Sequence, residues 1–210
     1  MATAGQQRRF TVASALTGLW LVTFFAAVAF FLGPNIFENR SEKLPAFILH
    51  IGGGSVVLLT GPFQFIAPIR NRYRRYHRIA GYVFVGGSVA AIIGFLMVMP
   101  GDTDMFLLSQ LVAITLWGLC VGVAVHAIRR KHVLTHQHNM ARAFVIAVYF
   151  VTVRIVDQHL MWALEPLSKV EGARFAHSDW LAWVIPLIAV EIWFGHKWDR
   201  LLKKRERSVG

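Results

Sequence analysis

The 210-residue chain is 56% hydrophobic and 16% charged, whereas soluble domains average about 45–50% and about 25%. Its net charge of +11 would suit a nucleic-acid-binding protein if the basic residues formed one patch. They lie instead between long apolar runs, so the sequence predicts an integral membrane protein and gives no support to nucleic-acid binding. The one cysteine, Cys120, excludes an internal disulfide and a cysteine-based metal cluster.

Six segments are long and apolar enough to cross a bilayer as helices, which takes about 20 residues. In chain order they cover residues 11–32, 45–68, 79–99, 107–128, 140–164 and 180–198. The connections are short and contain turn residues, as in Gly33-Pro34-Asn35 and Pro100-Gly101-Asp102, so no soluble domain fits between them. The sequence therefore predicts an all-α fold with a single integral membrane domain over residues 1–210. This domain is a six-helix transmembrane bundle around a four-helix core of helices two to five.

Lysine and arginine set the expected orientation, because short cytoplasmic connections retain positive charge. Basic residues gather at the N-terminus, in the second and fourth connections and in the tail: Arg8, Arg9, Arg70, Arg72, Arg74, Arg75, Arg78, Arg129, Arg130, Lys131, Arg142, Lys197, Arg200, Lys203, Lys204, Arg205 and Arg207. The alternate connections hold only Arg40, Lys43, Lys169 and Arg174. We therefore expect a multi-pass protein with both termini in the cytoplasm and a cytoplasmic face that binds anionic lipid headgroups.

The central helices carry a spaced motif of polar and aromatic residues. Its members are Leu49-His50-Ile51, Gly61-Pro62-Phe63-Gln64-Phe65, Arg70, His77-Arg78, Gly81-Tyr82, Trp117, His136, Met140 and Arg142. This pattern resembles the bacterial membrane family catalogued as domain of unknown function 2306, within a family-like core at about residues 45–164. The resemblance implies a protein of the bacterial inner membrane and names no reaction. Gln137, His138 and Asn139 depart from the basic and tryptophan residues usual at this point of the family.

Histidines lie on the central helices near both membrane faces. His50 and His159 fall near the outer ends of helices two and five, whereas His77 and His136 lie at the inner starts of helices three and five. A six-helix protein with this arrangement resembles the ascorbate-reducible b-type cytochromes, whose inner helices hold haem between pairs of histidines. The resemblance implies haem b as a cofactor, its iron as the only metal, and these four histidines as ligands. Helix four departs from the pattern, because Ser109 stands where an outer histidine is expected.

Three consecutive glycines, Gly52-Gly53-Gly54, follow closely after His50. They weaken a helix, so we expect close packing or a bound ligand to compensate. At helical spacing, His50, Gly54, Gly61 and Gln64 share one stripe, which we expect to face the interior of the bundle.

Ionisable residues inside a membrane are costly and indicate a functional site or a structural ion pair. Arg154 and Glu191 fall inside the predicted fifth and sixth helices, both about 15–16 Å deep at about 1.5 Å per residue. One expectation is a midplane Arg154–Glu191 ion pair, and the other is a pair between Arg154 and Asp157, three residues apart on one helix. The cytoplasmic rim adds three further polar candidates: Arg70, Arg78 and Arg142.

These features leave three functions open. The first is a b-type haem protein that transfers electrons and needs a redox partner. The second is a small-solute carrier, for which the available polar lining is Gln64, Arg154, Asp157, Gln158 and Glu191. The third is an accessory or assembly subunit of a larger membrane complex, which needs only a docking face. No Ser/His/Asp set or metal-hydrolase spacing stands out, so the sequence assigns no enzymatic reaction.

Overall fold

A computed structural model describes residues 43–99, 107–166 and 169–206, and all the regular elements in these ranges are helical. In chain order they are α2 (Leu44–Phe65), α3 (Ala67–Arg72), α4 (Arg74–Val98), α5 (Leu107–Arg129), α6 (Val133–Ile155) and α7 (Glu171–Glu206). A π-helical turn, η2 (Val156–Leu160), and a 3₁₀ turn, η3 (Met161–Leu164), connect α6 to α7. The chain divides into two compact units, Met1–Leu44 and Pro45–Gly210. The structure is described here for the second unit, and the predicted helix 11–32 lies outside the described residues.

Four stretches of the described chain are long and apolar enough to cross a membrane: α2, α4, α5 and Ala173–His196 of α7. Helix α6 is as long as α5, with 23 residues. However, its first turns carry His136, Gln137, His138, Asn139 and Arg142. These polar side chains lower its hydropathy, and α6 is not among the four. The all-helical membrane class is therefore confirmed, whereas the six-span count and the orientation of the termini stay predictions.

Helix boundaries differ from the predicted ones most around α6 and α7. Helix α6 begins at Val133 instead of residue 140, and its regular part ends at Ile155 instead of residue 164. Helix α7 begins at Glu171, well before residue 180, and extends to Glu206. Hydropathy locates the apolar part of a helix, whereas backbone hydrogen bonds continue through polar turns, so both starts were placed too late. The η2 turn also breaks the 100° rotation per residue that a regular helix would give beyond Ile155.

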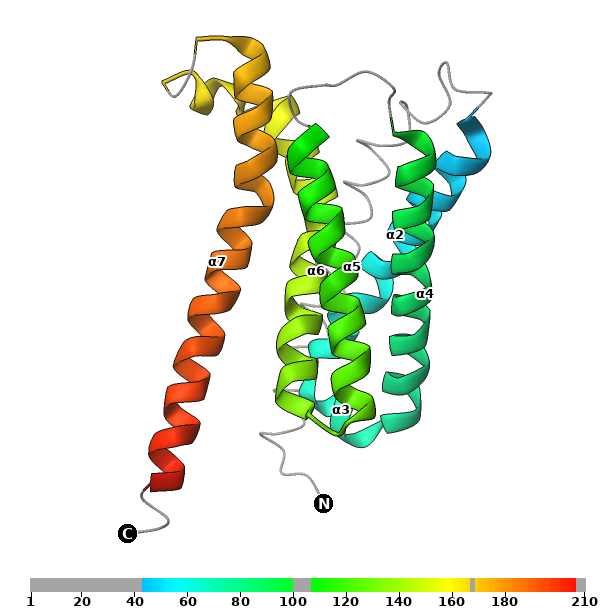
Figure 1. The fold of residues 1–210 in the computed structure, drawn as a ribbon, viewed down its shortest axis with the longest axis vertical. Helices are drawn as coiled ribbons and strands as arrows, with labels where there is room; N and C mark the ends of the chain where they lie inside the picture. Colours follow the sequence, from blue (N-terminus) through cyan, green and yellow to red (C-terminus); the bar gives the residue numbers. More distant parts are fainter. Residues whose placement is uncertain (1–42, 100–106, 167–168, 207–210) are drawn as a thin grey trace, which may run out of the picture. The chain divides into compact units, whose positions relative to one another are not determined.

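The helices lie side by side with alternating directions (Figure 1). Helix α5 packs along α6, and α7 packs mainly on α6. Helices α4 and α6 both begin at the end where α3 and the α5–α6 turn lie, which we call the basic end. The end where α5 and α7 begin and α6 finishes is called the opposite end. The buried core takes side chains from each long helix, among them Val57, Phe84, Trp117, Ile146 and Trp183.

Helices α2 and α4 approach so closely that their backbones are in contact. A Cβ atom on Gly53 would lie 2.6 Å from both the Ala91 nitrogen and the Gly87 oxygen. A Cβ atom on Gly94 would collide with the backbone of His50. We call this contact between α2 and α4 the glycine seam. His50 adds a hydrogen bond of 2.8 Å across it, from its Nδ1 to the Ala91 carbonyl oxygen. The close contact therefore depends on glycines, which have no side chain to keep the backbones apart, as is common where membrane helices associate.

Only one glycine of the Gly52-Gly53-Gly54 run serves this packing. Gly53 is buried, whereas a Cβ atom on Gly52 or Gly54 would meet nothing within 4 Å. The predicted stripe through Gly54 is thus wrong by one residue, since the buried face of α2 continues through Gly53 to Gly61 and Gln64. In the sequence, all three glycines are equally good candidates for a helix contact. Only the position of α4 shows that Gly53 makes it.

The triple glycine gives a matched test of the seam. We expect Gly53→Ala to destabilise the protein by about 1–3 kcal/mol, because the new methyl group meets rigid backbone atoms. Gly52→Ala and Gly54→Ala should be neutral or stabilising by up to about 1 kcal/mol, because alanine favours the helix and fills open space. Thermal unfolding in detergent would measure all three. Equal melting temperatures for the three variants would show that α2 and α4 do not touch at Gly53.

Candidate functional site

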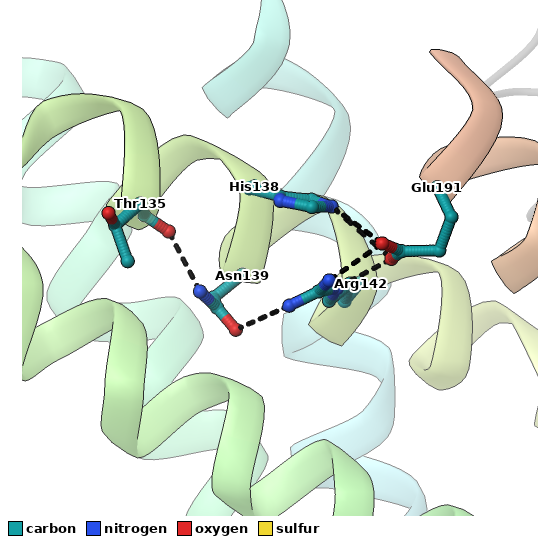
Figure 2. A network of polar contacts seen from close by, with 5 residues as sticks. All are labelled: Thr135, His138, Asn139, Arg142 and Glu191. Carbon is teal, nitrogen blue, oxygen red and sulfur yellow. Dashed lines mark hydrogen bonds and ion pairs between the residues drawn. The ribbon is translucent and has the colours of Figure 1, made fainter. Parts of the chain in front are cut away.

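A carboxylate on α7 is held by side chains of α6 (Figure 2). Arg142 donates from Nε to Oε1 of Glu191 at 2.6 Å and from its terminal NH2 group to Oε2 at 2.7 Å. His138 Nε2 lies 3.2 Å from the same carboxylate. Asn139 accepts from Arg142 at 3.3 Å and donates to the backbone oxygen of Thr135 at 2.9 Å. This planar two-point pairing is a strong form of ion pair, and it ties α6 to α7.

The partner of Glu191 is Arg142, and the predicted Arg154–Glu191 pair is wrong. Arg154 is the penultimate residue of α6, at the opposite end of the bundle. Glu191 lies 20 residues beyond Glu171, which is about 30 Å along α7 from that end at about 1.5 Å per residue. An end of helix five at residue 164 and a start of helix six at residue 180 would put both side chains at one depth, whereas α6 ends at Ile155 and α7 begins at Glu171. The alternative partner of Arg154, Asp157, accepts a hydrogen bond of 2.6 Å from the Ser178 hydroxyl.

Two imidazoles lie at the basic end in equivalent positions. His77 and His136 are each the fourth residue of their helices, α4 and α6, which begin at the same end (Figure 1). Their side chains are close enough for their charges to interact. Nδ1 of His136 lies 3.0 Å from the backbone oxygen of Ala124 in α5. Because a carbonyl can only accept, Nδ1 carries a proton, and in a neutral His136 ring the lone pair is then on Nε2.

Two buried polar atoms at the basic end have no hydrogen-bond partner in the described part of the chain. Gln64 is 7% exposed, and neither its Nε2 nor the buried Nδ1 of His77 has a hydrogen-bond partner among the described residues. The Oε1 atom of Gln64 lies 3.8 Å from the place of a Cβ on Gly81, one helical turn beyond His77. Arg70 of α3 is close enough to His77 to interact with it electrostatically. Gln64, His77 and His136 form what we call the imidazole site, and its unpaired buried atoms are available to the polar groups of a ligand.

The remaining predicted site residues do not join the imidazole site. Besides its hydrogen bond to α4, the His50 ring packs against Phe95 and Phe150, with ring centroids 5.8 and 5.7 Å away. His159 is exposed in η2, and Arg78 is exposed on α4. The structure therefore brings four of the predicted site residues together at the basic end: Gln64, Arg70, His77 and His136.

A second buried polar cluster lies at the opposite end, where α5, α6 and α7 meet. Asp179 is 3% exposed and Tyr149 is 1% exposed, and the Tyr149 hydroxyl donates to Oδ1 of Asp179 at 2.6 Å. The other carboxylate oxygen, Oδ2, is buried without a hydrogen-bond partner in the described part of the chain. Asp157 is close enough to interact with Asp179 electrostatically. Ser109 lies beside Asp179 and accepts a hydrogen bond of 3.0 Å from Nε1 of Trp183.

We call this cluster the acidic site and define it by Ser109, Tyr149, Asp157, Ser178 and Asp179. It combines two carboxyl groups with three hydroxyl groups. Across the described ranges, no three or more His, Cys, Asp or Glu side chains come together as a metal site.

Residues 47–194 match the family described as predicted membrane protein (DUF2306). The chain belongs to this family. The matched range contains the imidazole site, the ion pair of Figure 2 and the acidic site. The resemblance found from the spaced motif is thereby confirmed. No curated protein and no solved structure matches the chain.

The acidic site includes residues that the sequence analysis missed. Asp179 was placed in a connection before the last helix, whereas it lies more than two turns inside α7. Tyr149 lies in an apolar part of the predicted fifth helix, where nothing in the sequence distinguishes it from the other aromatic residues. One signal was available, because Asp179 lies four residues before Trp183 and therefore on the same helical face. The contacts with α5 and α6 could not be inferred from that spacing.

The α6–α7 ion pair can be tested with a double-mutant cycle. We expect Arg142→Met to destabilise the protein by about 1–3 kcal/mol, because it leaves Glu191 without its main partner. This range is below that of fully buried pairs, since the Arg142 and Glu191 side chains are 31% and 42% exposed. Adding Glu191→Leu should recover much of the loss. Unfolding of both single variants and the double variant in detergent measures the coupling, and additive effects would contradict the pairing.

The matched control is the Arg174–Glu165 pair, which spans 3.2 Å with Glu165 65% exposed. Exposed pairs contribute about 0–1 kcal/mol, so the corresponding cycle should show little coupling.

Proposed function

We propose that this chain is a membrane redox protein that holds one b-type haem between His77 and His136 at the basic end. The observation that carries the proposal is the matched position of the two histidines at the starts of α4 and α6. Two imidazoles from neighbouring helices are a common axial pair for haem in helical bundles. Bound haem would supply a one-electron carrier, and the chain would then exchange electrons with a redox partner.

The orientation of His136 supports this role. Its Nδ1–H is used by the Ala124 carbonyl of α5, so the lone pair on Nε2 is the one available to a metal. Histidine ligands of metals usually have this arrangement, in which a backbone carbonyl or carboxylate fixes the tautomer and the ring plane. The sequence contains no signal for it, because Ala124 contributes only its backbone oxygen.

The surroundings of His77 fit the same group. Gly81, one turn along α4, presents no side chain, and apart from Gln64 Oε1 nothing lies within 4 Å of its missing Cβ. Such a surface allows the flat face of a macrocycle to approach the backbone. The unpaired Nε2 of Gln64 and the guanidinium of Arg70 would suit the negatively charged propionate groups of haem.

The other two predicted ligands do not fit a second haem. The His50 ring is bonded to Ala91 and packed against Phe95 and Phe150, and the backbones of α2 and α4 are in contact beside it. His159 is exposed in η2. The proposal is therefore a single haem, in place of the two that the resemblance to b-type cytochromes implied.

A reduced-minus-oxidised optical spectrum of the detergent-purified protein tests the proposal. We expect one b-type haem band, which His77→Ala and His136→Ala each abolish while the protein still folds. His50→Ala should keep the band, and so should the control His132→Ala, whose side chain is exposed at the start of α6. A purified protein without a haem band, also after incubation with haem, would overturn the proposal and favour the carrier or accessory-subunit alternatives.

We also propose that the basic end faces the cytoplasm of a bacterial cell, with both termini on that side and anionic lipid headgroups against it. The charge distribution supports this orientation, because Arg129, Arg130 and Lys131 lie at the α5–α6 turn at that end.

Reporter fusions measure this topology. A reporter after Ser208 and one inserted at Lys131 should both be cytoplasmic, whereas one inserted at Lys169, before α7, should be external. An external reporter after Ser208 would overturn the proposed orientation, and a cytoplasmic reporter at Lys169 would contradict an α7 that spans the membrane.

A further inference from the structure

The acidic site has an unbalanced charge. Asp157 and Asp179 interact with each other, and the side chains that face them from α5 are the uncharged Ser109 and Gln110. From α6 they face Tyr149 and Arg154, of which only Arg154 carries a positive charge. Arg154 is exposed and interacts with Asp157. One carboxylate of the two is therefore left without a compensating cation among the described residues.

The uncompensated group is Asp179. It is almost completely buried, and its hydrogen bond from Tyr149 occupies Oδ1 alone. Oδ2 is buried and makes no hydrogen bond in the described part of the chain, while the side chains of Ser109 and Gln110 in α5 lie near enough to donate weakly to this carboxylate. A buried carboxylate with an unpaired oxygen is costly to maintain, and such groups are normally paired or bound to a cation. The unpaired oxygen therefore indicates a ligand that brings one positive charge.

We propose that Asp179 binds an exchangeable monovalent cation, which is either a proton or Na⁺. A proton would occupy Oδ2 directly, and Na⁺ would use Oδ2 together with hydroxyl oxygens of the acidic site, which are ligands that hard cations prefer. A divalent ion fits less well, because Arg154 already neutralises one of the two carboxylates. The site lies at the opposite end from the imidazole site and does not depend on the proposed haem.

The test measures the melting temperature of the full-length protein in detergent under two series of conditions. In the first, NaCl replaces choline chloride at constant ionic strength and pH. In the second, the pH is varied without Na⁺. A ligand that binds only the folded state stabilises it, and the stabilisation grows with the logarithm of the ligand concentration above Kd. If the site binds Na⁺, NaCl raises the melting temperature. If it binds only a proton, the two salts give the same value, and stability falls as the pH rises through the range in which the folded site loses its proton.

Asp179→Asn is the decisive variant, because the neutral amide is nearly isosteric and needs no cation. It should lose the sodium response or the pH response that the unmodified protein shows. Glu165→Gln, which neutralises an exposed carboxylate, is the matched control and should keep that response. An unmodified protein that responds to neither variable, or an Asp179→Asn variant that responds as the unmodified protein does, would overturn the proposal.

Tyr149→Phe keeps the proposal testable if Asp179→Asn fails to fold. It removes the hydroxyl that donates to Asp179, which makes a proton on the carboxylate more favourable and takes away one oxygen ligand for Na⁺. For a proton site the midpoint of the pH response should move to higher pH, and for a sodium site the stabilisation by NaCl should weaken because one oxygen ligand is lost. A response that Tyr149→Phe leaves unchanged would show that the cation does not bind at Asp179.

Discussion

The polar side chains of α6 have to find partners inside the bundle, because lipid offers neither hydrogen bonds nor counter-charges. Helix α6 carries such groups from its first turns to its last, and three of them bond to neighbouring helices. His136 bonds to a backbone carbonyl of α5, Arg142 pairs with Glu191 of α7, and Tyr149 bonds to Asp179 of α7. The two partners on α7 lie 30 and 49 residues away in the sequence, so these bonds fix where α7 packs on α6.

The two sides of the bundle are joined by different physical means. Helices α2 and α4 meet through glycine, with backbones in contact and one histidine hydrogen bond across the seam. Helices α6 and α7 meet through charged and hydroxyl side chains, supported by the stacking of His138 on Phe194 at 4.2 Å. The glycine contact between α2 and α4 leaves no space for added atoms. The polar contact between α6 and α7 has groups that can exchange ligands and protons. This difference explains why both proposed binding sites involve α6 and neither lies in the glycine seam.

The imidazole site and the acidic site lie at opposite ends of α6 and offer opposite chemistry. One collects neutral nitrogen ligands and a nearby guanidinium, which suits a metal cofactor with acidic groups. The other collects carboxyl and hydroxyl groups, which suits a small cation. Membership of the DUF2306 family covers both sites without assigning a reaction to either. The functional argument therefore depends on geometry, in particular on the unpaired atoms of Gln64, His77 and Asp179.

The sequence by itself determined the membrane class, the helical fold, the family and the apolar centres of the helices, because these depend on hydropathy and on spacing along the chain. It also singled out His77 and His136, because both lie at the inner starts of predicted helices. It placed the starts of α6 and α7 too late, because a polar turn at a helix end looks the same in sequence as a loop. That error led to the wrong partner for Glu191. Only the tertiary structure decided that Arg142 pairs with Glu191, that Gly53 and not Gly54 carries the seam, and that Asp179 is buried. Each of these depends on which face of a second helix lies opposite, and no periodicity within one helix contains that information.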